Sequence, residues 1–309
     1  MENAIQNWYV IINPTSGNGS AKKKWPKIKT LLTQYNFEFE FAYTEFDKHS
    51  KELAQKAIKN GFKNIICIGG DGTLHNIVNG IFNQSFSNPS DITIGIIPIG
   101  TGNDWIKTHN IPKHIESSIK IIKKGFIANQ DLGKIEFQNY NGSPVFFNNS
   151  AGVGFDGYVV SYVNKYKYLG ALSYLIGAIA CMFSFKNFNA TINTNEFSVK
   201  TLMITIGLCK YSGGGMQLTN NPSPFDGLFD ISMGNNFHSI DIIKNIISLF
   251  NGKIDRIEKV KCFKTRGIKI EFDIDNLPLI QADGELVGSG DFKITLLPKA
   301  LAFYTSKSL

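Results

Sequence analysis

The first 129 residues alternate between short apolar runs and amphipathic stretches. The apolar runs that are typical of buried strands lie at residues 8–12, 37–41, 64–68 and 92–97. The stretches with apolar residues at helical spacing lie at 27–35, 51–59, 74–82 and 114–124. Strands that alternate with helices in this way predict an α/β domain over residues 1–129, with a parallel sheet covered by helices on both faces.

After Asn129 the pattern changes to closely spaced apolar runs separated by Asn, Gly and Pro turns. The runs lie at 132–137, 145–148, 190–192, 201–207, 228–232, 268–272 and 292–297. Two helical stretches interrupt them, at 158–185 and 239–250. Many short strands with turns between them predict a mostly β, sandwich-like domain over residues 130–298, with helical insertions. We expect residues 299–309 to pack back on the first domain.

The composition is that of a globular chain with an excess of positive charge. At 309 residues the chain is long enough for two domains. Its formal net charge of +7 favours an anionic partner, which could be nucleotide phosphate, an acidic membrane surface or nucleic acid. Basic residues gather at 22–24 and 259–269, a grouping that suits contact with an anionic membrane. Because no nucleic-acid-binding module accompanies them, nucleic acid is the weaker interpretation.

Cysteine usage and hydropathy indicate a cytoplasmic protein. The four cysteines are scattered without a Cys-x-x-Cys pair, which is typical of reduced thiols and disfavours a zinc site. The N-terminus lacks the basic and apolar regions of a signal peptide. The uncharged stretch 168–185 is at the short end of what a membrane span needs, so we interpret it as a buried or membrane-facing helix. We expect peripheral rather than integral contact with membranes.

The segment with the most specific chemistry is Gly69-Gly70-Asp71-Gly72-Thr73, which follows the strand at 64–68 and precedes the helix at 74–82. Glycines at such a turn let backbone N–H groups approach an anion at a helix N-terminus. The Asp can bind a metal or take a proton. The pentapeptide therefore indicates a turn that handles phosphate.

Two further glycine-bearing turns follow strands of the same domain, at 13–19 and at 98–104. The carboxyl ends of parallel strands lie at one edge of an open sheet, where ligands bind in the crevice. Either turn alone is commonly structural, because Asn, Pro and Gly favour turn geometry for local reasons. Three such turns after successive strands predict a single nucleotide site.

Two other nucleotide motifs are disfavoured. A literal G-x-G-x-x-G occurs at 152–157, after a strand-like stretch and before a helix. It lacks the βαβ context and the acidic residue about 20 positions later that a dinucleotide fingerprint requires. The Walker A pattern is absent from the chain, which excludes the P-loop folds.

Taken in order, the turns at 13–17, 69–73 and 98–104 resemble those of the diacylglycerol kinase catalytic domain family. That family includes bacterial soluble lipid kinases and the sphingosine and ceramide kinases. The resemblance continues in Gly213-Gly214-Gly215, in the segment 223–230 and in Asp283-Gly284-Glu285, so that it covers nearly the whole chain. It implies a two-domain fold like that of NAD kinase and diacylglycerol kinase, with ATP bound in the cleft between the domains.

The resemblance also implies roles for particular residues. Glu285 would accept the proton of the lipid hydroxyl, with Asp71, Asp283 and Asp104 as further carboxylates near the reacting phosphate. A structural magnesium ion in the second domain would be bound by Ser223, Asp226 and the backbone carbonyl of Leu228. The residues that would contact the nucleotide are Asn13, Pro14, Thr15, Ser16, Gly17, Thr44, Gly69, Gly70, Asp71, Gly72, Thr73, Leu74, His75, Asn76, Gly100, Thr101 and Asn103.

Elementary chemistry agrees with several of these roles and leaves others open. Asp71 is a hard oxygen ligand on a rigid turn, which suits Mg²⁺ bound to phosphates. An Asp-Gly-Glu triplet taken alone favours an ordinary hairpin turn over a catalytic one. Family members commonly have Asn and Glu where this chain has His75 and Asn76. The nucleotide role of these two residues is therefore open, and a role of His75 in the fold is favoured over one as general base.

We therefore expect an ATP- and Mg²⁺-dependent lipid kinase, with diacylglycerol as the favoured substrate and phosphatidic acid as the product. The alternatives are a kinase of sphingoid bases, ceramide or another lipid, a kinase of a soluble alcohol such as NAD, and a non-catalytic regulator that binds nucleotide or lipid. The segments 213–215 and 223–230 disfavour the soluble-alcohol kinase. The carboxylates of Asp71 and Glu285 disfavour the regulator. A homodimer is compatible with the sequence.

Overall fold

The computed structural model describes residues 7–138, 142–165, 187–192, 197–237, 239–273 and 277–306. The chain forms two compact units. Unit 1 runs to Gln130 and resumes at Lys299, and unit 2 is Asp131–Pro298. The chain passes from one unit to the other within strand β5 (Ile127–Phe137) and again within strand β15 (Phe292–Tyr304).

Unit 1 is an α/β domain built on a parallel sheet. Its strands are β1 (Asn7–Ile12), β2 (Glu38–Tyr43), β3 (Asn64–Gly69), β4 (Thr93–Pro98) and the end of β15. The sheet order is β2-β1-β3-β4-β15, and every described pairing in it is parallel. Its helices are α1 (Ser20–Gln34), α2 (His49–Lys59), α3 (Asp71–Phe82), α4 (Asp104–Thr108) and α5 (Ile115–Lys124), with a short 3₁₀ turn at Pro89–Asp91.

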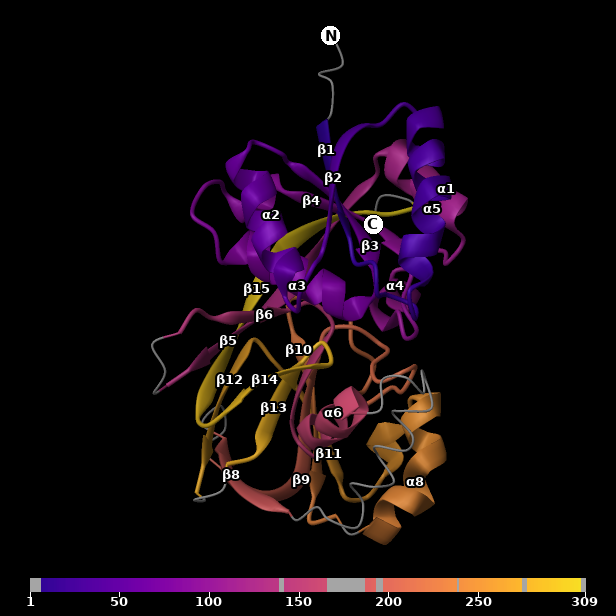
Figure 1. The fold of residues 1–309 in the computed structure, drawn as a ribbon. Helices are drawn as coiled ribbons and strands as arrows, with labels where there is room; N and C mark the ends of the chain where they lie inside the picture. Colours follow the sequence, from indigo (N-terminus) through magenta and orange to yellow (C-terminus); the bar gives the residue numbers. More distant parts are fainter. Residues whose placement is uncertain are drawn as a thin grey trace. The chain divides into compact units, whose positions relative to one another are not determined.

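Helices cover both faces of this sheet, as the alternating pattern predicted. Figure 1 shows α1 and α5 on one face of the strands and α2 and α3 on the other. The core under α1 and α5 contains Trp25 and Ile28 of α1 against Val10 and Ile12 of β1, all 5% exposed or less. Because β1 is buried on both faces, nearly every residue of it is apolar, which gives the continuous run seen in the sequence.

Three helices of unit 1 begin earlier than the sequence pattern predicted, and α2 does so by two residues, at His49. Helix α1 begins at Ser20 instead of residue 27 and continues through Pro26. The pattern missed these first turns because three consecutive exposed lysines separate their two buried residues, Ala21 and Trp25. Two apolar residues are too few to show helical spacing. Helix α3 begins at Asp71 instead of residue 74, so the Asp-Gly-Thr of the motif forms its first turn.

Unit 2 is a β-rich, sandwich-like domain. Its strands are the later part of β5, β6 (Val145–Phe147), β7 (Ser150–Gly154), β8 (Phe188–Ile192), β9 (Phe197–Gly207), β10 (Phe229–Asn235), β11 (Val260–Thr265), β12 (Gly267–Phe272), β13 (Leu279–Ala282), β14 (Glu285–Ser289) and the first part of β15. Its described helices are α6 (Phe155–Lys165), α8 (Ser239–Asn251) and a 3₁₀ turn at Ile254–Arg256. The described pairings among β7 to β14 are antiparallel.

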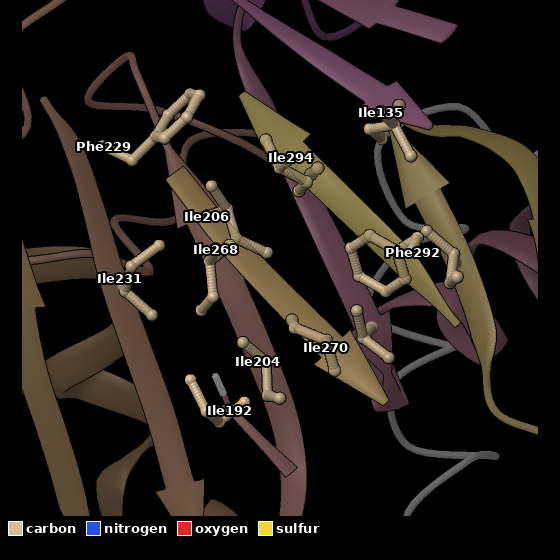
Figure 2. Packing of buried hydrophobic residues seen from close by; sticks show 14 of the residues in the cluster. Ile135, Ile192, Ile204, Ile206, Phe229, Ile231, Ile268, Ile270, Phe292 and Ile294 are labelled. Carbon is tan, nitrogen blue, oxygen red and sulfur yellow. The ribbon is translucent and has the colours of Figure 1, made fainter. Parts of the chain in front are cut away.

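One apolar core holds the strands of unit 2 together. Figure 2 shows Ile204 and Ile206 of β9, Ile268 and Ile270 of β12 and Phe292 of β15 pointing into the same interior. All five are 2% exposed or less. Burial of such side chains contributes about 1.5–3 kcal/mol each, so this cluster is the main source of the stability of unit 2.

The sequence pattern missed β7, β11, β13, β14 and the five-residue helix α4. Strand β7 is small-residue rich, Ser-Ala-Gly-Val-Gly, and has none of the β-branched enrichment that marks a strand. Most of the predicted helix at 158–185 lies outside the described residues, which end there at Lys165. Among the residues that the structure describes, no helix has both the length and the apolar character to cross a membrane.

Candidate active site

The three turns singled out from the sequence gather at one edge of the unit 1 sheet. Strand β1 lies between β2 and β3, so the chain leaves β1 toward one side of the sheet and leaves β3 toward the other. The order 2-1-3-4 therefore has its topological switch point between β1 and β3, where open α/β sheets bind ligands. The turn at 13–19 follows β1, and Asp71 follows β3 after a single residue.

Asn13 connects the first turn to the second. Its backbone N–H donates to Ile68 O at 3.0 Å, and its side-chain Nδ2 donates to Thr73 Oγ1 at 3.0 Å. Its Oδ1 accepts hydrogen bonds from the backbone N–H and the hydroxyl of Thr15, at 3.1 and 2.8 Å. One amide side chain thus holds the shape of its own turn and ties it to the first turn of α3. Pro14 and Ser16 lie in the same turn.

The second and third turns touch through glycine backbones. A Cβ placed on Gly100 would lie 2.6 Å from Gly70 Cα and 2.4 Å from Asn103 Oδ1. Real Cβ atoms do not approach this closely, so only glycine permits the contact. Asn103 holds the third turn by donating from Nδ2 to Gly100 O at 2.7 Å, and Gly17 of the first turn packs against Ile99. The three turns therefore form one connected surface.

Asp71 is the first residue of α3 and also contacts the N-terminus of α4. Its carboxylate accepts the backbone N–H of Asp104 at 3.0 Å and that of Trp105 at 3.4 Å. Trp105 anchors α4, because its ring is buried and its Nε1 donates to Gln130 Oε1 at 2.9 Å. The position of the Asp71 carboxylate is thus fixed by two helices. Burial, and secondarily the charge of Asp71, raise the pKa of the Cys67 thiol beneath it, which keeps that thiol protonated.

The remaining residues of the predicted nucleotide set differ in their surroundings. His75 is 5% exposed and lies in the second turn of α3, where its Nε2 is 3.3 Å from Asn79 Nδ2. Asp104 is also buried, and its carboxylate pairs with Lys107 Nζ at 2.6 Å. Thr44 follows β2, and its backbone N–H donates to Ile12 O at 2.8 Å. In the described structure, Gly69, Gly72, Leu74 and Asn76 lie on β3 and α3, and Thr101 is exposed.

In unit 2, Asp283 and Gly284 form a two-residue turn between β13 and β14. Ala282 pairs with Glu285 across the turn, and the φ angles of Asp283 and Gly284 are 52° and 81°. Positive φ at both central residues is the type I′ geometry that Asp-Gly favours. Glu285 is therefore the first residue after the turn, with an intermediate exposure.

The carboxylate of Asp283 is used to hold this turn in place. It accepts the backbone N–H groups of Asn148, Asn149 and Ser150, at 3.1, 2.8 and 3.2 Å. The backbone N–H of Asp283 donates in return to Ser150 O at 2.8 Å. Asp283 is 8% exposed. Its contacts are those of a residue that positions the hairpin carrying Glu285.

Of the three residues expected to bind a structural magnesium ion, Asp226 pairs with a lysine. Asp226 accepts Lys264 Nζ at 2.8 Å and the backbone N–H of Leu228 at 3.1 Å. The same ammonium lies 3.2 Å from Asp230 Oδ2, and burial raises the pKa of Asp230 while Lys264 opposes the shift. Ser223 Oγ accepts the backbone N–H of Phe225 at 3.4 Å. Since Lys264 already supplies a positive charge to Asp226, this arrangement does not fit a divalent cation as it stands, and the metal assignment stays a prediction.

Among the residues that the structure describes, no three side chains of His, Cys, Asp or Glu lie together in a group that could hold a metal ion. The G-x-G-x-x-G at 152–157 lies at the end of β7 and the start of α6. Strand β7 pairs antiparallel with β9 and β13, so the motif has no βαβ unit around it. This placement agrees with the interpretation that it is not a dinucleotide site.

Comparison with protein-family models accounts for both units. Residues 7–135 match the diacylglycerol kinase catalytic domain, and residues 149–305 match the YegS C-terminal NAD kinase beta sandwich-like domain. The chain belongs to the diacylglycerol kinase family. The resemblance found in its motifs is thereby confirmed, as is the predicted pairing of an α/β domain with a sandwich-like one. Membership makes the chain a lipid kinase.

Individual relatives of this family match the chain over most of its length. It is 26% identical to a diacylglycerol kinase of Mycobacterium tuberculosis strain H37Rv, over 94% of this chain and 92% of that one. It is 25% identical to a diacylglycerol kinase of Staphylococcus carnosus, over 97% and 95%. A crystal structure of a diacylglycerol kinase from Bacillus anthracis superposes with a TM-score of 0.73 at 22% identity, over 98% of both chains. At that identity the superposition shows the shared fold.

Three side chains that contact predicted site residues or their turns, directly or through one another, could not be identified from the sequence. Lys264 was noted as part of a basic group, and its pairing with Asp226 and Asp230 depends on β10 and β11 lying side by side. Gln281 and Asp156 carry no motif of their own, and they meet only because α6 packs on β13. No sequence signal distinguishes such contacts from those of ordinary polar residues.

Proposed function

We propose that this lipid kinase transfers the γ-phosphoryl group of ATP to the hydroxyl of a lipid alcohol, with diacylglycerol as substrate and phosphatidic acid as product. The observation that carries the proposal is the joined set of three turns at the switch point of unit 1. Asn13 bonded to Thr73 and Gly70 in contact with Gly100 make a single glycine-lined surface at the start of α3. Backbone donors and the positive end of a helix dipole are what phosphate groups require.

The nucleotide set follows from this surface. The turn at 13–17, the first turn of α3 and the turn at 100–103 present glycines, hydroxyls and amides toward the bound phosphates and sugar. His75 contributes to the fold instead, because it is buried and packs against Asn79. Phosphoryl transfer needs positioning and charge neutralisation more than covalent chemistry, so such a surface with one base is sufficient machinery.

Glu285 is the proton acceptor in this proposal. It directly follows a rigid type I′ turn whose Asp283 is bound to three backbone N–H groups. A base must be held within hydrogen-bond reach of the proton that it takes. A tightly held turn fixes the backbone position of the residue that follows it. Asp283 then acts as a positioning residue, and Asp104 supports α4 through its pair with Lys107.

Asp71 is the residue of unit 1 that fits a magnesium ion accompanying ATP. Its carboxylate is a hard oxygen donor, and two backbone hydrogen bonds fix its orientation. Mg²⁺ bound with ATP neutralises phosphate charge during transfer. Asp71 would hold the ion, and its carboxylate also ties α3 to α4, which fixes the spacing of the second and third turns.

Peripheral contact with an anionic membrane brings the enzyme to its substrate. Lys22, Lys23 and Lys24 are exposed on the first turns of α1, and Lys261 and Arg266 are exposed in unit 2. Each basic residue near an anionic surface adds about 1 kcal/mol of attraction. A lipid hydroxyl lies at that surface, so the same charges that bind the membrane bring the enzyme close to it.

An assay with purified protein, radiolabelled ATP and Mg²⁺ tests the proposal. Micelles of diacylglycerol, ceramide or sphingosine are compared with NAD as a soluble alcohol. The variant Asp71→Asn/Glu285→Gln, purified in the same way, measures contaminating kinases. We expect phosphatidic acid from diacylglycerol at a rate well above that background. Labelled product from ceramide or sphingosine alone would show that this lipid, and not diacylglycerol, is the substrate. Labelled product from NAD alone, or from none of the compounds, would refute the proposal.

A further inference from the structure

Two side chains of unit 2 connect the hairpin that carries Glu285 to a buried carboxylate. Gln281 is the third residue of β13, two positions before Asp283. Its Nε2 donates to Asp156 Oδ2 at 2.6 Å, and its Oε1 accepts the backbone N–H of Gly284 at 2.9 Å. Gln281 is 3% exposed, so water does not substitute for either contact.

The chemistry of the two contacts fixes the orientation of the Gln281 amide. The backbone N–H of Gly284 is a donor and can be met only by the carbonyl oxygen of the amide. The amide NH₂ must then face Asp156, whose carboxylate accepts it. A chain of two hydrogen bonds therefore runs from Asp156 through Gln281 to the turn, and reversing the amide would break both.

The glycines of the 152–157 motif make room for this chain. Gly152 lies directly opposite Gln281 in the β7–β13 pairing, and a Cβ on it would lie 2.1 Å from Asp156 Oδ2 and 2.9 Å from Gln281 Nε2. A Cβ on Gly157 would lie 2.5 Å from Leu279 O, so α6 can approach β13 only with glycine there. The motif that resembled a dinucleotide fingerprint is thus explained by close packing around Asp156.

We propose that Gln281 is a positioning residue for the reaction. Asp156 anchors its side chain, and Gln281 in turn holds the Asp283–Gly284 turn so that the position of Glu285 is fixed. Together with the Asp283 contacts, both backbone N–H groups of the turn are satisfied, Asp283 N by Ser150 O and Gly284 N by Gln281. The turn is therefore held from two sides before Glu285. This inference rests on the proposed role of Glu285.

Because Asp156 is buried, its hydrogen bond with residue 281 is sensitive to a second negative charge placed beside it. Burial raises the pKa of Asp156 to about 6, and the Gln281 hydrogen bond opposes that shift. No charged side chain in the described part of the chain contributes to it. A carboxylate introduced at position 281 would therefore face Asp156 alone, and the two would share a proton unless the pH were high.

The substitution Gln281→Glu tests the proposal, since it retains the acceptor for Gly284 but replaces the donor to Asp156. We expect kcat for lipid phosphorylation to fall about tenfold or more at pH 8 and to recover toward pH 6, with KM for ATP unchanged. The double variant Gln281→Glu/Asp156→Asn exchanges acid and amide, and should return kcat to within about threefold of wild type at pH 8. Gln34→Glu, on the exposed face of α1, is the control and should change nothing.

Amide hydrogen exchange separates this inference from the proposed function, because it needs no substrate. Gln281→Leu should increase the exchange rate of the Gly284 amide about tenfold or more, while amides of the unit 1 sheet exchange as in wild type. A wild-type kcat and pH profile for Gln281→Glu, or an unchanged Gly284 amide in Gln281→Leu, would overturn the positioning role. Absence of lipid phosphorylation by the wild-type protein, with the Gly284 effect present, would instead overturn the proposed function alone.

Discussion

Asn13 Nδ2 donates a hydrogen bond to Thr73 Oγ1 across sixty residues of chain. The bond joins the turn after β1 to the first turn of α3, on the two sides of the switch point of the unit 1 sheet. This bond sets the spacing between the first two of the three turns for which we propose phosphate binding.

Thr73→Val removes the hydroxyl and keeps the size of the side chain. We expect KM for ATP to rise about tenfold, since the turn at 13–17 loses its tie, and the free energy of unfolding to fall by about 1 kcal/mol. Thr73→Ser retains the hydroxyl and serves as the control in steady-state kinetics and denaturant unfolding. Equal KM values for the Val and Ser variants would show that the bond does not organise the nucleotide site.

Gly100→Ala should separate the second and third turns. Its Cβ would lie 2.6 Å from Gly70 Cα, a backbone atom that cannot rotate away. We expect kcat/KM for ATP to fall about 10²-fold, because phosphate donors move by a fraction of an ångström or more. Gly61→Ala is the matched control: Gly61 has φ 87° with nothing within 4 Å of its Cβ position, so it should cost about 1 kcal/mol of stability and leave kcat/KM unchanged.

Glu285→Gln keeps the shape of the side chain and removes its ability to accept a proton. We expect kcat for lipid phosphorylation to fall about 10²-fold or more while the Kd for ATP stays at the wild-type value, as for the loss of a general base. Calorimetric ATP titration and the lipid kinase assay measure the two quantities. Glu258→Gln, at an exposed position of unit 2, is the control. A wild-type kcat in Glu285→Gln would assign the proton to another acceptor.

The buried carboxylate of Asp156 should make the stability of the protein depend on pH. Its pKa in the folded state is about 6, above the ordinary value of 3.8. The folded chain therefore binds the proton more tightly, and this contribution to stability is complete below pH 3.8 and is lost as the pH rises through about 6. Over that window the difference in unfolding free energy between wild type and Asp156→Asn should change by about 3 kcal/mol, with wild type losing stability. Urea unfolding at several pH values measures the difference, and parallel curves for the two proteins would contradict it.

Lys264 and a divalent cation should compete for Asp226. The ammonium lies 2.8 Å from one carboxylate oxygen of Asp226. That oxygen would have to bind the metal, so the ammonium and the metal cannot both use it. In Lys264→Met we expect Mg²⁺ to raise the melting temperature more than in wild type, and Asp226→Asn in the same background to remove the effect. Lys253→Met, at an exposed position, controls for general loss of charge. An identical response to Mg²⁺ in wild type and Lys264→Met would show that the lysine does not occupy a cation site.

The predictable parts of this fold are those with strong local signals. The strands around residues 10, 66 and 95 were predictable because burial on both faces makes nearly every residue apolar. The family motifs were predictable because glycine at a close approach has no substitute, as Gly70 and Gly100 show. Strands β7, β13 and β14 were not, because β7 consists mostly of small residues and Gln281 of β13 serves a contact with α6, so these strands have few of the residues that mark strand propensity.

The sequence by itself determined the two-domain class, the family and the positions of the three glycine-bearing turns, since these follow from periodicity and from residue types that only one geometry permits. Tertiary structure decided how the polar side chains are used. Asp283 binds three backbone N–H groups of a segment more than 130 positions away, and Asp226, in the turn before β10, pairs with Lys264 of β11. Hydrogen bonds between distant segments depend on strand register and helix packing, and the side chains that make them have no local pattern to reveal them.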